Sequence, residues 1–203
     1  WSVSWPSLFI QNFQPLVLII WPFIMLIYEC RVSNVEMCSD AYEHEVLEIE
    51  GVPSGNVFMI QSAMAVEGAT DVDVGCGNAF GGGDDDLDDE EVKVNNIVNS
   101  FQYTPSSALA DKKAFKQLFG TYVKSVQAAV KPGKNGGPEA VKAFQAEAKA
   151  YFKFLLSNFK ELELYMNSGG ECEGHFGIGY WAEGCSDAPK FIYWKTALNE
   201  VKC

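Results

Sequence analysis

The densest group of side chains able to do chemistry is a run of carboxylates. The stretch from Gly75 to Glu91 reads GCGNAFGGGDDDLDDEE, and its seven acids are Asp84, Asp85, Asp86, Asp88, Asp89, Glu90 and Glu91. Calcium prefers such oxygen ligands, but an EF-hand loop needs glycine at its sixth position and glutamate at its twelfth. In a loop that starts at Asp84, those positions hold Asp89 and Asn95. We therefore expect a solvated acidic loop that binds calcium weakly.

The glycines that precede these acids do not indicate a nucleotide site. A phosphate-binding loop continues from its second glycine with lysine and then serine or threonine, because the lysine contacts the phosphates and the hydroxyl binds magnesium. Gly77 and Gly82 have the required spacing, but Gly83 and Asp84 follow them. The neighbouring carboxylates would also repel a phosphate, so we expect no nucleotide binding here.

Cysteine and histidine are too scattered to indicate a metal centre. The cysteines are Cys30, Cys38, Cys76, Cys172, Cys185 and Cys203, and the histidines are His44 and His175. Structural zinc needs four clustered ligands, and the sequence contains no CxxC pair. We interpret the cysteines as free thiols of a protein from a reducing compartment.

The histidines do not indicate a catalytic base either. His44 lies in the acidic segment YEHEVLE, which we expect to be exposed, and His175 lies in a glycine-rich turn. A general base must be oriented by a neighbouring group within a site. The HExxH, GxSxG and protein-kinase motifs are absent from the sequence, so we predict a protein that is not an enzyme.

Charge is distributed unevenly along the chain. The net charge of −12 over 203 residues argues against a nucleic-acid partner. Between Asp111 and Lys160, however, ten lysines face three acids, so this segment carries +7 and the remainder −19. The lysines that we select as a candidate partner face are Lys112, Lys113, Lys116, Lys124, Lys142, Lys149 and Lys153. They either solvate a helix surface or dock an acidic partner, such as a tubulin tail or an anionic membrane.

The same segment has the strongest helical pattern in the chain. Apolar residues from Phe115 to Val130 recur at three- and four-residue intervals, and Asp111 is a suitable N-cap. The stretch KPGKNGGP should end this helix. Pro138 then suits the first turn of a second amphipathic helix. Two long helices with a short connection predict an antiparallel hairpin over about residues 111–160.

The segments on either side of the hairpin are rich in β-branched and aromatic residues, which favour strands. We predict strands over residues 25–30, 57–66, 92–104, 175–181 and 190–200. The segment 32–45 is predicted to be rich in turns. The length and the 48% hydrophobic content suffice for one substantial core.

Residues 1–24 do not match the rest of the chain. They lead into the apolar run LVLIIWPFIMLIY, whose thirteen residues fall short of the roughly 20 that cross a bilayer as a helix. No Lys or Arg precedes this run, which argues against a secretory signal. We interpret residues 1–24 as an extension foreign to the domain, with Met25 as the natural start. A membrane anchor is the alternative.

Taken in order, several motifs resemble the translationally controlled tumour protein family, also called fortilin or histamine-releasing factor. The stretch MLIYECRVSNVEMCSDAY resembles the family's first strand and the acidic-Met-aromatic-Ser-Asp segment after it, with Cys38 in place of the aromatic residue. The stretch GCGNAFGGG resembles its signature, in which Gly77 and Asn78 are kept but proline, serine and glutamate are replaced. The stretches FKQLFGTYVKSV, SNFKELELYM and PKFIYWKTALNEVKC continue the match, so that it covers residues 25–203.

This resemblance implies an α+β fold, mainly β, with a tent-like β core, a projecting α-helical hairpin and a long flexible acidic loop over about residues 75–91. It also implies a non-enzymatic cytoplasmic protein that binds calcium weakly, has no tightly bound cofactor, stabilises microtubules by binding tubulin, and acts in growth and survival with anti-apoptotic partners. The alternative role that it implies is regulation of nucleotide exchange on a Rheb-type GTPase or on the translation elongation factor. Glu36 is the candidate GTPase contact, unless it is simply an exposed turn carboxylate.

Overall fold

The computed structural model describes residues 25–66, 93–106, 111–167, 176–182, 184–185 and 187–202, apart from the side chain of Asn135. The extension predicted over residues 1–24 and the acidic loop predicted over about residues 75–91 lie outside this part of the chain. So do the calcium candidates Asp84, Asp85, Asp86, Asp88, Asp89, Glu90 and Glu91, the signature residues Gly77 and Asn78, and His175.

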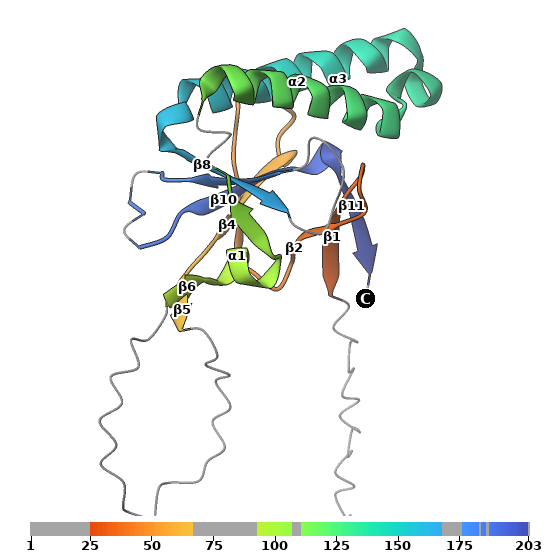
Figure 1. Ribbon diagram of the computed structural model, residues 1–203. Helices are drawn as coiled ribbons and strands as arrows, with labels where there is room; N and C mark the ends of the chain where they lie inside the picture. The colour runs from red at the N-terminus through yellow and green to blue at the C-terminus, as the bar shows by residue number, and fades with distance from the viewer. Residues whose placement is uncertain are drawn as a thin grey trace, which may run out of the picture.

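Within the described residues, the chain forms eleven strands and three α-helices (Figure 1). The strands are β1 (Leu26–Cys30), β2 (Glu36–Ser39), β3 (His44–Val46), β4 (Val57–Gln61), β5 (Met64–Val66), β6 (Lys93–Asn95), β7 (Tyr103–Pro105), β8 (Leu162–Asn167), β9 (Phe176–Tyr180), β10 (Lys190–Trp194) and β11 (Leu198–Lys202). The helices are α1 (Asn96–Ser100), α2 (Lys112–Val130) and α3 (Pro132–Ser157), with short 3-10 turns η2 (Phe159–Glu161) and η3 (Lys195–Ala197).

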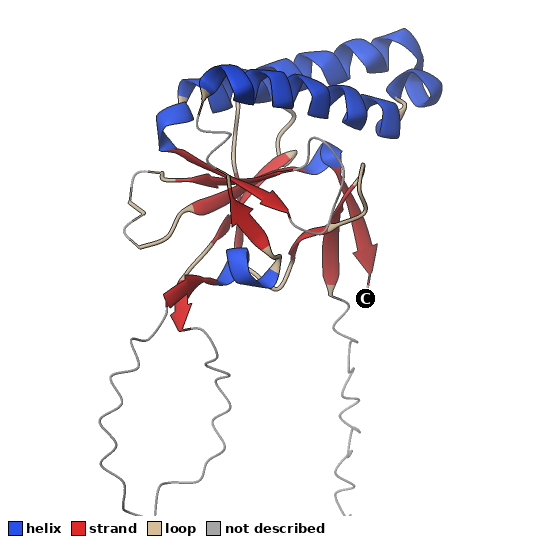
Figure 2. Ribbon diagram, viewed as in Figure 1, coloured by secondary structure: helices blue, strands red, loops and turns tan. Residues whose placement is uncertain are grey.

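The strands form three antiparallel sheets. The largest has the order β3-β4-β10-β9-β8-β7, the second β11-β1-β2, and the third is the pair β5-β6. The helices α2 and α3 cover one end of these strands, whereas α1 and β5-β6 lie at the opposite end (Figures 1 and 2). The α+β class that was predicted is therefore confirmed.

The six-stranded sheet is buried on both faces at its centre. Alternate residues of β4 and β10 enter two different apolar clusters, because successive side chains of a strand point to opposite faces. Val57, Met59, Ile192 and Trp194 join the cluster beneath the hairpin, and Phe58, Ile60, Phe191 and Tyr193 join the cluster toward the second sheet. Burial on both faces explains why VFMI and FIYW are continuous apolar runs without polar alternation.

The first helix of the hairpin begins and ends as predicted. The Asp111 carboxylate accepts hydrogen bonds from two backbone N–H groups of the first turn, at 3.2 and 3.3 Å, and Lys131 ends α2 in the left-handed conformation, with φ of 49°. The prediction that KPGKNGGP is non-helical was wrong in part. The chain is helical again from Pro132 and bends at Gly137, where φ is 68°. Proline is tolerated at a helix start because the first N–H groups have no partner within the helix.

Several strand predictions were wrong in detail. The segment 32–45, predicted to be rich in turns, contains β2 and the first two residues of β3. The segment 57–66 is two strands in different sheets. The β4–β10 ladder ends at Gln61 and Lys190, and the residue before β10, Pro189, has no N–H to continue it. The segment 92–104 contains α1, since the Asn95 side chain caps the first N–H groups of a helix. Strand β8 was not predicted, because it follows α3 closely and its sequence reads as a continuation of that helix.

Candidate functional site

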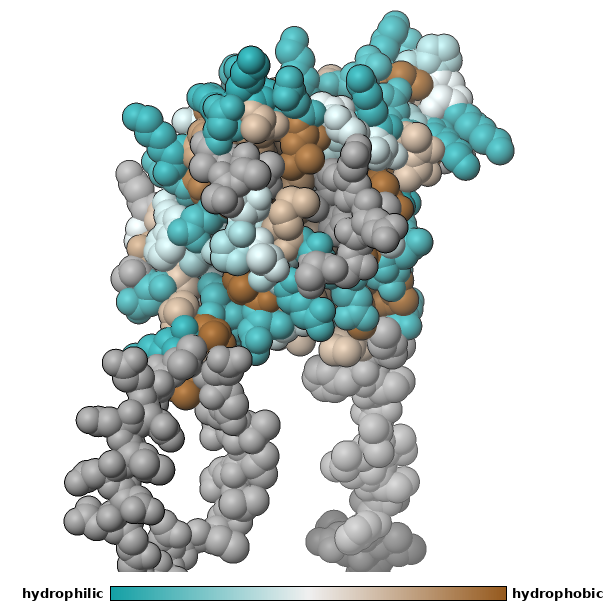
Figure 3. Space-filling model, in the orientation of Figure 1, coloured by the Kyte–Doolittle hydropathy of each residue, from teal (hydrophilic) through white to brown (hydrophobic). Residues whose placement is uncertain are grey.

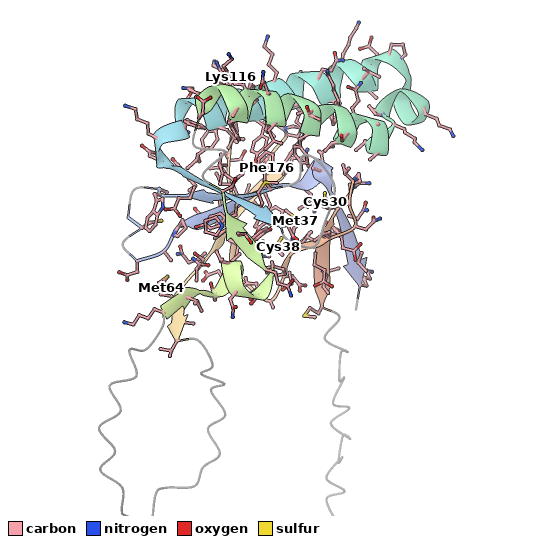
Figure 4. All side chains as sticks on the ribbon, viewed as in Figure 1. Cys30, Met37, Cys38, Met64, Lys116 and Phe176 are labelled. Carbon is pink, nitrogen blue, oxygen red and sulfur yellow. The ribbon has the colours of Figure 1, made fainter. Side chains whose placement is uncertain are left out.

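An aromatic cluster holds the hairpin on the sheet. Phe119 of α2 stacks on Phe152 of α3, with ring centroids 4.6 Å apart and an interplanar angle of 14°. Phe115, one turn earlier on α2, lies 5.9 Å from Phe176 of β9, which is located between the hairpin and the strands in Figure 4. The start of α2 lies beside the end of α3, where Lys112 hydrogen-bonds to the Leu156 carbonyl, so the two helices run antiparallel in this structure. The inner face of the hairpin is thus buried, while its far end extends beyond the strands (Figure 1).

A buried carboxylate ties α3 to the sheet. Glu147 is 9% exposed, and its Oε1 accepts hydrogen bonds from Trp194 Nε1 at 2.5 Å, Asn56 Nδ2 at 2.7 Å and Thr196 Oγ1 at 2.8 Å. Its donors are therefore neutral groups, and no ion pair of Glu147 is found among the described residues. Sequence reasoning missed this contact, although one signal existed. Glu147 interrupts the apolar face of its helix between Phe144 and Tyr151.

The predicted lysine face is an exposed surface over both long helices. All ten lysines between positions 111 and 160 are exposed. Lys142, Lys149 and Lys153 follow one another at intervals of seven and four residues, which places them on one face of α3. On α2, Lys116 points away from the sheet (Figure 4), and hydrophilic side chains cover this side of the hairpin (Figure 3).

Very little negative charge opposes these lysines. Within the described residues, the ion pair that involves the hairpin joins Lys142 Nζ to Glu139 Oε1 at 3.7 Å, and both side chains are largely exposed. An exposed pair of this kind contributes at most about 1 kcal/mol to stability. Because Glu147 is buried and Asp111 caps α2, the outer surface of the hairpin is positive.

One lysine of the predicted face has a different environment. Lys112 Nζ donates a hydrogen bond to the Leu156 carbonyl at 3.0 Å and lies 5.8 Å from the ring centroid of Phe159. Lys112 therefore joins the start of α2 to the end of α3. The remaining lysines of the face, Lys113, Lys116, Lys124, Lys142, Lys149 and Lys153, are the ones available to a partner.

Glu36 is not a turn carboxylate but the first residue of β2, at the edge of the three-stranded sheet. Its side chain is exposed, and it lies opposite Glu29 of β1 across a register shift. The next residue, Met37, is buried and accepts hydrogen bonds at its carbonyl from the hydroxyls of Tyr103 (2.9 Å) and Tyr193 (3.1 Å). This strand is therefore fixed from the inside, while the Glu36 carboxylate faces solvent.

The described cysteines are free thiols, as predicted, namely buried Cys30 and Cys38 and half-buried Cys185. Burial raises the pKa of the Cys38 thiol well above its ordinary value, so this sulfur stays protonated at neutral pH. Cys30, Met37 and Cys38 lie in the interior among the strands (Figure 4). His44 is exposed, as expected.

Metal-binding clusters and membrane-spanning helices are both absent from the described part of the chain. No group of three or more His, Cys, Asp or Glu side chains is placed there to hold a metal ion. None of the helices in those residues combines the length and the apolarity that a membrane crossing requires.

Comparison with known proteins supplies the family. The model of the translationally controlled tumour protein family matches residues 25–199. A translationally controlled tumour protein homologue of Gibberella zeae is 34% identical over 181 residues, which are 88% of this chain and 99% of the relative. The corresponding homologue of Yarrowia lipolytica is 30% identical over 179 residues, with the same coverage.

Solved structures agree with these matches. The translationally controlled tumour-associated protein of Schizosaccharomyces pombe superposes with a TM-score of 0.59 at 27% identity, covering 86% of this chain and 98% of that one. The translationally controlled tumour protein of Caenorhabditis elegans has the same fold, with a TM-score of 0.59 at 23% identity, covering 88% of this chain and 98% of its own. The chain therefore belongs to the translationally controlled tumour protein family.

Proposed function

We propose that this chain is a non-enzymatic cytoplasmic binding protein whose lysine face docks an acidic protein segment, such as a tubulin tail, and thereby stabilises microtubules. The observation that carries this proposal is the exposure of ten lysines on the hairpin, where the exposed acids are Glu139 and the helix cap Asp111. A membrane or a nucleic acid fits less well, because an extended anionic surface meets the charge of the whole chain, −12, whereas a short acidic segment meets only the positive hairpin.

The chemistry of the face predicts how it binds. Every basic residue of the hairpin is a lysine, and an ammonium group is a compact point charge that lacks the bidentate geometry of arginine. Such a surface attracts carboxylates strongly at low salt without demanding one arrangement of them. The aromatic cluster and Lys112 keep the two helices side by side, and Glu147 holds α3 on the sheet. The face is therefore pre-organised before the partner arrives.

Microtubule co-sedimentation tests the proposal. The double variant Lys149→Gln, Lys153→Gln should bind about fivefold more weakly than the unmodified protein, since two of the exposed charges are lost. The matched control is Lys93→Gln, Lys202→Gln, which removes the same charge from exposed positions on β6 and β11 and should bind normally. Equal pelleting of both double variants would contradict the proposal, as would undiminished binding to microtubules whose acidic tails have been removed by limited proteolysis.

The second candidate function is regulation of nucleotide exchange on a Rheb-type GTPase or on the translation elongation factor. The observation that favours it is the position of Glu36, exposed at the end of an edge strand whose interior side is fixed by Tyr103 and Tyr193. A carboxylate presented in this way competes for the magnesium ion or the lysine that holds a nucleotide phosphate. Nucleotide release should be accelerated by the unmodified protein and by Glu29→Val, but not by Glu36→Val. Unchanged release with the unmodified protein would remove this candidate.

Weak calcium binding belongs to the same proposal and is supported by the sequence alone. The acids from Asp84 to Glu91 provide seven carboxylates within eight residues, which attract a divalent cation without the geometry of a dedicated site. Replacing Asp84, Asp86 and Asp88 with asparagine should weaken calcium binding measured by isothermal titration calorimetry. An unchanged titration would place the ion elsewhere.

A further inference from the structure

The far end of the hairpin carries a shallow hollow that shares Lys124 with the lysine face defined above. It has a volume of about 400 Å³ and is formed where α2 ends and α3 begins. We call it the tip hollow. Its lining includes the charged Lys124, Lys131 and Lys134, which we call its rim, and the apolar Ala128, Pro132 and Val141, which we call its floor. Apolar and hydrophilic residues lie side by side at this end of the molecule (Figure 3).

The rim of the tip hollow is positively charged. Lys124, Lys131 and Lys134 are all exposed, and none of them takes part in an ion pair among the described residues. Three ammonium groups around one depression repel one another, and an anionic ligand relieves that repulsion. The rim therefore selects a ligand with several negative charges.

The floor of the tip hollow is apolar. Pro132 is buried and Val141 is half-buried, and the backbone of Gly133 lies so close to Val141 that a Cβ built on it would be 3.1 Å from Val141 Cγ2. This close packing gives the hollow a well-defined base. The hollow is open to solvent, and its volume of about 400 Å³ is enough for one apolar side chain. A purely anionic ligand would leave this floor in contact with water.

The lysine stripe on α3 begins at Lys142, the residue after Val141 of the tip hollow. Lys153, Lys149 and Lys142 lie on one face of the helix, with Lys142 nearest to the hollow in the chain. Lys142 and Lys153 are eleven positions apart, which corresponds to about 16 Å along a helix, a distance that about five residues of an extended peptide cover. An extended acidic chain therefore follows the stripe better than a compact anion does.

We propose that the tip hollow anchors an apolar side chain of an extended acidic peptide whose carboxylates lie along the lysine stripe. This inference rests on the proposed function and adds a sequence preference to it. A segment of acids alone would bind through charge only, whereas a segment with a leucine-like side chain at one end would also bury apolar surface.

Two fluorescein-labelled peptides test this preference by fluorescence anisotropy. The first consists of eight glutamates, and the second has leucine in place of one glutamate near its end. Charge alone predicts weaker binding of the leucine peptide, because it has one negative charge fewer. The tip hollow predicts the reverse, with binding about fivefold tighter, as expected for partial burial of one leucine.

Two phenylalanine variants locate the effect. Ala128→Phe fills the tip hollow and should abolish the preference for the leucine peptide. The matched control is Thr121→Phe, two turns earlier on the same face of α2 and equally exposed, which should retain it. Val141→Thr keeps the side-chain shape, places a hydroxyl in the floor and should reduce the preference.

Each outcome of these titrations has a distinct meaning. If both peptides bind equally, or if the preference survives Ala128→Phe, the tip hollow does not anchor an apolar side chain. The proposed function is unaffected by that result. Absence of binding of either peptide at low salt overturns the proposed function and this inference with it. The protein could instead bind vesicles of phosphatidylcholine and phosphatidylserine more tightly than either peptide and lose that binding in Ala128→Phe. This result would assign the hollow to a membrane surface and overturn the proposal of a peptide ligand.

Discussion

Replacing Glu147 with alanine tests how the hairpin is held on the sheet. The Glu147 carboxylate is the common acceptor of three donors on other elements, Trp194 at the end of β10, Asn56 before β4 and Thr196 in η3. Alanine removes the acceptor without changing the donors. The buried donors then lose their hydrogen bonds while the surrounding structure still excludes water.

The structure sets the size of the expected effect. Trp194 is 3% exposed, so its indole N–H would be left without a partner, at a cost of about 1–3 kcal/mol. Asn56 and Thr196 are half-buried and hydrogen-bond to each other at 2.9 Å. Losing their hydrogen bonds to Glu147 therefore costs less free energy than leaving the Trp194 N–H without a partner. With the cavity that the shorter side chain leaves, we expect the free energy of unfolding to fall by about 3 kcal/mol. Glu147→Gln retains one acceptor oxygen and should cost about 1 kcal/mol, because a neutral acceptor makes a weaker hydrogen bond.

Urea unfolding followed by circular dichroism measures this loss. For a slope of about 2 kcal/mol per molar urea, the midpoint of Glu147→Ala should fall by about 1.5 M. The matched control is Glu139→Ala on the same helix, whose side chain is exposed and whose loss should change stability by less than about 0.5 kcal/mol. If both alanine variants unfolded at the same urea concentration, the carboxylate would not hold α3 to the sheet, and the argument from its three donors would fail.

Three further predictions concern the N-cap, alkaline pH and the thiols. Asp111→Ala should lower the free energy of unfolding by about 1 kcal/mol in the same assay, because the helix loses its N-cap. Asp111→Asn still caps the helix and should be nearly neutral. An equal loss of stability in both variants would refute the capping role of Asp111. Burial raises the pKa of the Cys38 thiol, so at alkaline pH the folded state keeps a proton that the unfolded state releases. The free energy of unfolding should therefore fall as the pH rises above the unfolded pKa of about 8.5, by up to about 1.4 kcal/mol per pH unit. Cys38→Ala should flatten this part of the stability curve, and an unchanged slope would contradict the assignment. An alkylating reagent at neutral pH should modify the half-buried Cys185 well before Cys38, as read by peptide mass analysis, and the reverse order would be inconsistent with the buried thiol.

Helical elements were predictable from the sequence to the extent that their signals are local. The N-cap at Asp111, the apolar spacing of α2 and the end of that helix at Lys131 depend on residues within a few turns of one another. The short strands had no comparable signal. Strands β2 and β3 are four and three residues long, and such lengths are set by pairing with β1 and β4 rather than by a pattern of their own.

The sequence alone determined three features of this protein. They are the clustering of ten lysines within residues 111–160, the amphipathic helices that carry these lysines, and the absence of known catalytic motifs. Tertiary structure decided which charges are available, because it buried Glu147 against Trp194, used Lys112 to join the two helices and left the other lysines in solvent. It also decided the order of the sheets, in which β10 pairs with β4 more than a hundred residues earlier. These contacts join residues far apart in the chain, and their energies depend on burial and geometry that arise only when the whole fold has formed.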